Sequence, residues 1–69
     1  MVKHNGWSNY KTWRAVVEID NTEYLYTRWH RAAKEMTAAD LTKQLAAHYP
    51  DKDINHREIA EHLQDPENF

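Results

Sequence analysis

The fold class is decided by the stretch LYTRWHRAAKEM, residues 25–36. Its apolar members recur at intervals of three and four residues: Leu25, Trp29, Ala32 and Met36. This spacing places them on one face of an α-helix, with charged side chains on the opposite face. A helix is therefore expected from about Thr22 to Met36.

Three further segments have helical spacing, and the last two of them end before a proline. The first runs from Tyr10 to about Ile19, the second from Thr37 to a stop before Pro50, and the third from Asn55 to a stop before Pro66. Their expected inward faces carry Tyr10, Trp13, Val16 and Val17 in the first, Leu41, Leu45 and Tyr49 in the second, and Ile59 and Leu63 in the third. The sequence predicts an all-α protein, a compact bundle of three to four short helices.

Each expected helix is preceded by a residue type that caps helix N-termini. Ser8 or Asn9 can cap the helix expected to start at Tyr10, Thr37 the helix that ends before Pro50, and Asn55 the helix that ends before Pro66. Each would accept a hydrogen bond from a free backbone N–H. Asp20, followed three residues later by Glu23, resembles a capping box for the helix that contains Trp29.

One alternative architecture remains open. Trp13, Ala15, Val17 and Ile19 also alternate with other residues at a period of two, which is the pattern of a strand. Tyr24 and Tyr26 would face them across a turn at residues 20–21. The alternative fold is α+β, with an N-terminal β-hairpin over residues 13–26 followed by two helices.

The chain of 69 residues is long enough for one small domain, residues 1–69, with flexible ends expected at 1–6 and 65–69. It has no cysteine, so neither disulfides nor thiolate metal sites are available. The sequence has neither the apolar stretch of a signal peptide nor a run of about 20 apolar residues. A cytoplasmic protein without a membrane segment is expected.

A chain this short, without metal or disulfide, is expected to use its aromatic rings in the core or to oligomerise, because burial of large side chains is needed to offset the entropy of folding. Trp13 and Trp29 are expected to be core residues, and replacing either with alanine is expected to cost about 3–5 kcal/mol. Trp7 is expected to cover the N-terminal end of the core, and Phe69 to fold back onto the bundle.

The sequence contains residue types that enzymes use, but their spacing matches none of the catalytic or metal-binding motifs considered. The five histidines do not show the i, i+4 pairing of a helical zinc site. The chain has a single glycine, so it lacks a glycine-rich phosphate loop and a nucleophile elbow. We therefore expect a non-enzymatic protein without catalytic residues, metal or cofactor.

Charge is distributed unevenly along the chain. Residues 1–36 carry six basic and four acidic side chains, and residues 50–69 carry two basic and six acidic ones. The candidate protein-binding residues are acids of the second group: Asp51, Asp53, Glu58, Glu61 and Asp65. Such a surface can be guided to a basic groove on another protein by electrostatic attraction.

An alternative interface lies on the helix expected over residues 22–36. Arg28, Arg31 and Lys34 recur there at intervals of three, with aromatic residues between them. Basic residues interleaved with aromatic ones are typical of nucleic-acid contacts. A small nucleic-acid-binding or regulatory protein is therefore the alternative function.

Asn9-Tyr10-Lys11-Thr12-Trp13, followed by Ile19-Asp20-Asn21 and Tyr24, resembles a family of small proteins encoded by bacteriophages, plasmids and some bacterial and archaeal genomes. The resemblance covers about residues 8–30. It implies an origin in a mobile element and no catalytic residues.

Together with the charge pattern, the resemblance leads us to expect a phage accessory protein that binds a host or defence-system protein in the bacterial cytoplasm. An inhibitor such as an anti-CRISPR is one example, and homodimerisation is a further way to complete the core.

Overall fold

The structure is a computed structural model that describes residues 6–65, and this part of the chain forms four helices. They are α1 (Tyr10–Asn21), α2 (Glu23–Glu35), α3 (Ala38–His48) and α4 (His56–Gln64). The all-α prediction is confirmed. The alternative hairpin is wrong, because the residues assigned to it belong to α1 and α2. Phe69 and the expected flexible ends, apart from Gly6 and Asp65, lie outside the described residues.

Local capping explains why three of the helices begin where they do. The side-chain oxygen of Asn9 accepts from the Thr12 N–H at 2.9 Å. Thr37 accepts from the Asp40 N–H at 3.2 Å, and Asn55 from the Glu58 N–H at 3.1 Å. Each bond satisfies a backbone donor that has no partner within its helix. The three predicted caps are confirmed, with Asn9 serving α1.

The predicted capping box at Asp20 is wrong. Asp20 lies inside α1, and Thr22 is the N-cap of α2 without a side-chain cap hydrogen bond. The two Asp20 carboxylate oxygens instead face histidines, 3.5 Å from His30 Nε2 and 3.2 Å from His62 Nε2. The Asp20 side chain, which the sequence spacing assigned to a helix cap, therefore makes contacts with α2 and α4 instead.

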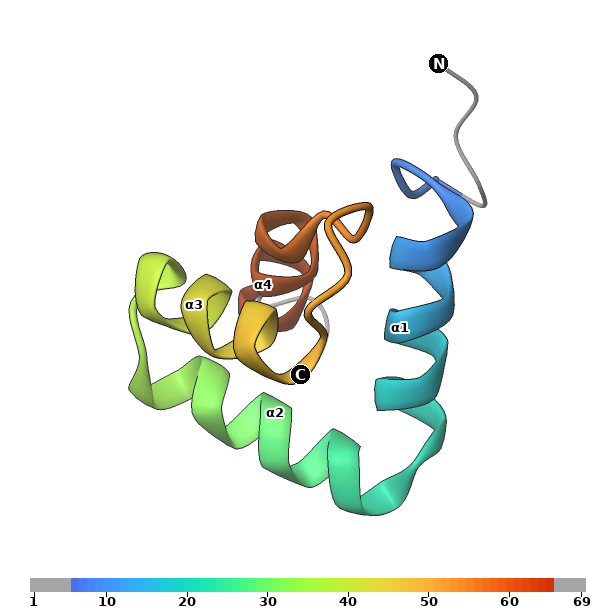
Figure 1. Ribbon diagram of the computed structural model, residues 1–69. Coiled ribbons are helices and arrows are strands. Elements are labelled where there is room, and N and C mark those ends of the chain that lie inside the picture. The colour runs from blue at the N-terminus through green and yellow to red at the C-terminus, as the bar shows by residue number, and fades with distance from the viewer. Residues whose placement is uncertain (1–5, 66–69) are drawn as a thin grey trace.

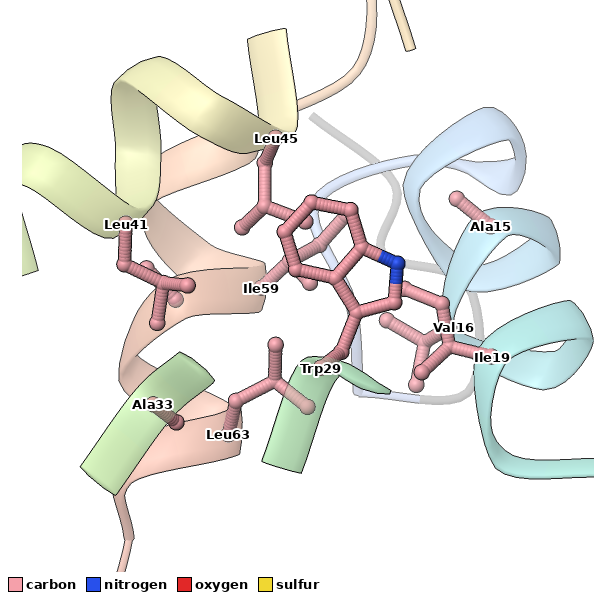
Figure 2. Packing of buried hydrophobic residues seen from close by; sticks show 10 residues of the cluster. Ala15, Val16, Ile19, Trp29, Ala33, Leu41, Leu45, Ile59 and Leu63 are labelled. Carbon is pink, nitrogen blue, oxygen red and sulfur yellow. The ribbon is translucent and has the colours of Figure 1, made fainter. Parts of the chain in front are cut away.

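The helices surround one core to which α2 contributes the largest side chain. α2 and α4 each contact the other three helices, whereas α1 and α3 do not pack against each other. Figure 1 shows α1 and α3 on opposite sides of the bundle, with α2 passing beneath both. The Trp29 indole, 3 % exposed, lies in Figure 2 between Leu41 and Leu45 of α3 and Val16 and Ile19 of α1. Trp29 is thus confirmed as a core residue that fills the space between two helices that do not meet.

The inward face of α1 differs from the predicted one. The buried residues of this helix are Thr12, Ala15, Val16 and Ile19. Tyr10 is 54 % exposed, and Trp13 is half-buried and outside the core cluster, with its ring centroid 5.7 Å from that of Tyr10. The prediction of Trp13 as a core residue is therefore wrong. Trp7 packs against the core cluster, as expected.

Small side chains recur among the buried residues, with Ala15 on α1, Ala33 on α2 and Ala60 on α4. Among residues 6–65, no helix combines the length and the apolar character that crossing a bilayer requires.

Replacing Trp29 with alanine is expected to lower the free energy of unfolding by about 3–5 kcal/mol, because the cavity left between α1 and α3 has no side chain to fill it. Trp13→Ala, the matched change at a half-buried tryptophan, is expected to cost about 1 kcal/mol. Urea denaturation followed by circular dichroism measures both. Equal costs for the two variants would contradict the core described above.

Candidate functional site

Three of the acidic residues predicted as a binding surface, Asp51, Asp53 and Glu58, lie close to the start of α1. There, hydrogen bonds join the N-terminal end of α1 to the N-terminal end of α4. We call this region of contact the junction. Its centre is Thr12, whose fully buried hydroxyl accepts from the Asn55 backbone N–H at 2.9 Å. The Asn55 side chain in turn donates to the Ser8 hydroxyl at 3.3 Å. The cap of α4 is therefore held by residues of α1 and of the segment before it.

Two further bonds cross the junction in the same way. The Ser8 N–H donates to the Glu58 carboxylate at 3.0 Å. The Asn9 amide donates to the Asp53 carbonyl oxygen at 2.6 Å. Asn9 and Thr12, the polar residues of the NYKTW sequence, thus have a structural role in which each bonds to residues more than 40 positions away.

Lys11 adds an ion pair at the outer edge of the junction. Its Nζ lies 3.1 Å from an Asp51 carboxylate oxygen and 3.0 Å from one of Asp53. The hydrogen bond from the Asp53 backbone amide and that from Lys11 lower the pKa of Asp51. The hydrogen bonds to Asp53 and Asp51 raise the pKa of Lys11. All three side chains are well exposed, so the pair adds little stability despite these shifts.

The junction engages three of the five acids that were predicted to bind a protein partner. Asp51 and Asp53 hold Lys11, and Glu58 holds the Ser8 N–H. Glu61 is exposed on α4, and Asp65 is the exposed C-cap of that helix. Three of the five acids therefore already have partners within the molecule, and Lys11 supplies one positive charge to two of them.

The outward side of α2 presents a different set of groups, which we call the α2 outer face. The exposed residues on it are Glu23, Tyr24, Tyr26, Thr27, Arg28, Arg31, Lys34 and Glu35. Tyr24 is 67 % exposed and Tyr26 42 % exposed, both unusually high for such large rings. The three basic residues that were predicted to bind nucleic acid thus lie together and face solvent.

Two shallow grooves run along the α2 outer face, one on each side of a ridge. Thr27, Arg31 and Glu35 line both grooves and form the ridge. The first groove, which we call the Arg28 groove, adds these residues to the ridge: Thr22, Glu23, Tyr24, Arg28, Ala32 and Met36. The second adds Tyr26, His30 and Lys34. Both are open depressions, suited to a surface of another molecule.

Arg28 is held in place by neighbours on two helices. Its guanidinium lies 3.3 Å from the Tyr24 hydroxyl and 3.2 Å from His48 Nε2 on α3. It also lies over the Trp29 ring, 5.8 Å from the centroid, and the His48 ring meets the same indole edge-on. Sequence reasoning missed Tyr24 and His48. The i, i+4 spacing of Tyr24 and Arg28 pointed to the first, whereas His48 is 20 residues from its partner.

The histidines give no sign of a metal centre. Residues 6–65 contain no group of three or more histidine and carboxylate side chains arranged to hold a metal ion. Two of the histidines, His30 and His62, face the same Asp20 carboxylate, with their Nε2 atoms directed at its two oxygens. This contact joins α1, α2 and α4 at the end of the bundle away from the junction.

Replacing Thr12 with valine is expected to lower the free energy of unfolding by about 1–3 kcal/mol, because the Asn55 N–H loses its acceptor inside the protein. Thr12→Ser keeps the hydroxyl and is expected to retain the bond. Thermal and urea denaturation of both variants tests this. A valine variant as stable as the serine variant would contradict the role assigned to the hydroxyl.

The Asp51 carboxyl is expected to titrate below the usual aspartate range, as followed by NMR of its carboxyl carbon. A lowered pKa in the folded state stabilises the protein above the ordinary aspartate pKa, and this contribution disappears as the pH falls through the lowered value. Lys11→Met should move the titration partly back, because the Asp53 amide bond remains, and Lys43→Met should leave it unchanged. An unshifted Asp51 in the wild type would contradict the ion pair.

Comparison of the chain with protein-family models, with curated proteins and with solved structures found no match.

Proposed function

We propose that this chain is a non-enzymatic protein that acts by binding another protein, and that the α2 outer face is its contact surface. The observation that carries the proposal is the exposure of two tyrosines and two arginines on one helix. Tyrosine and arginine are the residue types that dominate the binding energy of protein interfaces.

The arrangement of the buried polar groups supports a non-enzymatic role. Thr12 and His30 are the buried polar residues within positions 6–65, and each faces a structural partner, Asn55 and Asp20 respectively. The grooves on α2 are open to solvent, whereas enzymes enclose most of the surface of a small substrate.

The contact surface in this proposal is the α2 outer face and no longer the acidic region 51–65. Asp51, Asp53 and Glu58 already have partners at the junction, so a protein that bound them would have to displace those partners. On the α2 outer face, the Arg28 guanidinium contacts Tyr24 and His48 and keeps further N–H donors for a partner.

A second candidate function is nucleic-acid binding through the same face. Arg28, Arg31 and Lys34 are all exposed there, and Tyr24 and Tyr26 offer rings on which bases can stack. Glu23 and Glu35 lie in the same grooves and would repel phosphates. We therefore favour a protein partner.

In its most specific form, the proposal describes an accessory protein of a phage or mobile element that works in the bacterial cytoplasm. It would inhibit a host defence system, for example as an anti-CRISPR, by covering a surface that the target needs. The resemblance of residues 8–30 to phage- and plasmid-encoded proteins supports this origin, and the small size of the chain suits occlusion of a larger protein.

Site-specific photo-cross-linking tests the proposal. Thr27→p-benzoylphenylalanine, on the ridge of α2, is expected to capture one protein from a bacterial lysate. The same photoreactive residue at Ala47, exposed on α3, is the control and is expected to capture none. Arg31→Ala in the first variant should remove the adduct, and Lys43→Ala should not. Equal adducts from positions 27 and 47 would contradict the proposal, and a nucleic-acid adduct from position 27 would favour the second candidate.

A further inference from the structure

We propose that Arg28 is a carboxylate-binding residue and that the partner presents a short acidic helix to the Arg28 groove. This inference rests on the proposed function and specifies the chemistry of the partner. It starts from the way in which the structure positions the Arg28 guanidinium.

The Arg28 side chain is positioned before any partner arrives. The Tyr24 hydroxyl and His48 Nε2 contact its two terminal nitrogens, NH1 and NH2, and the Trp29 ring lies below its plane. Of these three supports Trp29 is buried in the core, whereas Tyr24 and His48 are exposed and His48 packs edge-on against the Trp29 ring. An arginine held in this way loses less side-chain freedom on binding than a mobile one.

The guanidinium keeps donors for a ligand. It has five N–H groups, and the contacts to Tyr24 and His48 use two of them. A planar group with paired donors matches the two oxygens of a carboxylate. Arg31 follows three residues later on the same helix and lines the same groove, so a second carboxylate can be bound one turn along.

The remainder of the groove determines which acidic partner fits. Ala32 and Met36 give it an apolar floor, and Glu23 and Glu35 lie toward its two ends. The order along the groove is therefore negative, positive, positive, negative. A helix with two acidic residues one turn apart, an apolar residue on the same face and a basic residue at each end is complementary to this order.

The same order argues against a phosphate backbone. A nucleic acid carries negative charge along its whole length, so it would meet Glu23 and Glu35 as well as the arginines. An acidic helix of limited length avoids both glutamates. Charge complementarity thus selects a protein segment.

Two synthetic peptides test the inference with the full-length protein. The first is a helical peptide with an alanine and leucine framework, two central glutamates four residues apart and a lysine at each end. The second has glutamine in place of both glutamates. Titrations are followed by NMR of the Arg28 side-chain Nε–H and of the backbone amides. The first peptide is expected to shift the Arg28 signal and to bind about tenfold or more tightly than the second, because a hydrogen-bonded charge pair is lost.

Four variants identify the residue that is responsible. Arg28→Lys keeps the charge but lacks the planar fork, and is expected to weaken binding of the first peptide about tenfold. Tyr24→Phe removes one support and is expected to weaken it by a smaller factor. Arg31→Ala is expected to weaken it, whereas Lys43→Ala, with the same loss of charge on α3, is not. Circular dichroism establishes that each variant is folded.

Several results would overturn the inference. These are equal affinity for the two peptides, unchanged binding by Arg28→Lys, and tighter binding of a duplex DNA than of the first peptide. A further one is a homodimer in light scattering that dissociates on Arg28→Ala, because a second copy would then occupy the groove. If position 27 still cross-links a protein while the acidic peptide fails, the inference is wrong and the proposed function stands. If cross-linking also fails, both are wrong.

Discussion

The arrangement of the molecule depends on one buried hydrogen bond, from the Asn55 backbone to the Thr12 hydroxyl. It fixes which side of α1 faces inward, and it brings the loop before α4 against the start of α1. Asp51, Asp53 and Glu58 then meet Lys11 and Ser8, and the acidic part of the chain becomes part of the scaffold. The α2 outer face presents Tyr24 and Tyr26 to solvent, two of the three exposed tyrosines among residues 6–65.

The inner side of α2 contributes to the core and its outer side faces solvent, and the two sides are in contact at the adjacent residues Arg28 and Trp29. Trp29 fills the space between α1 and α3, and its neighbour Arg28 lies over the same indole on the outside. In so small a protein, burial of one tryptophan, worth about 4–6 kcal/mol before entropy, is a large share of the stabilising free energy. The Arg28 guanidinium therefore lies against a side chain that belongs to the core.

Those features that depend on neighbouring residues could be predicted from the sequence. The helix starts at Asn9, Thr37 and Asn55 are examples, because a cap bonds to an N–H three residues away. The cap predicted at Asp20 was wrong, because its carboxylate faces two histidines that are 10 and 42 residues away. Trp13 was misplaced because the long-range bond of Thr12 sets the rotation of α1. The contact of Lys11 with Asp51 and Asp53 could not be predicted, because no pattern in residues 50–65 indicates that Lys11 lies beside them.

Asp20 has a consequence for how the fold comes apart. Its carboxylate holds the last turn of α1 against α2 and α4, while Thr12 holds the first turn against α4. A helix that is fastened at one end only can fray progressively from the other. With both ends fastened, partial peeling gains little chain entropy until both fastenings have broken. We infer that α1 detaches as a single cooperative unit, and that its amide protons exchange with solvent together.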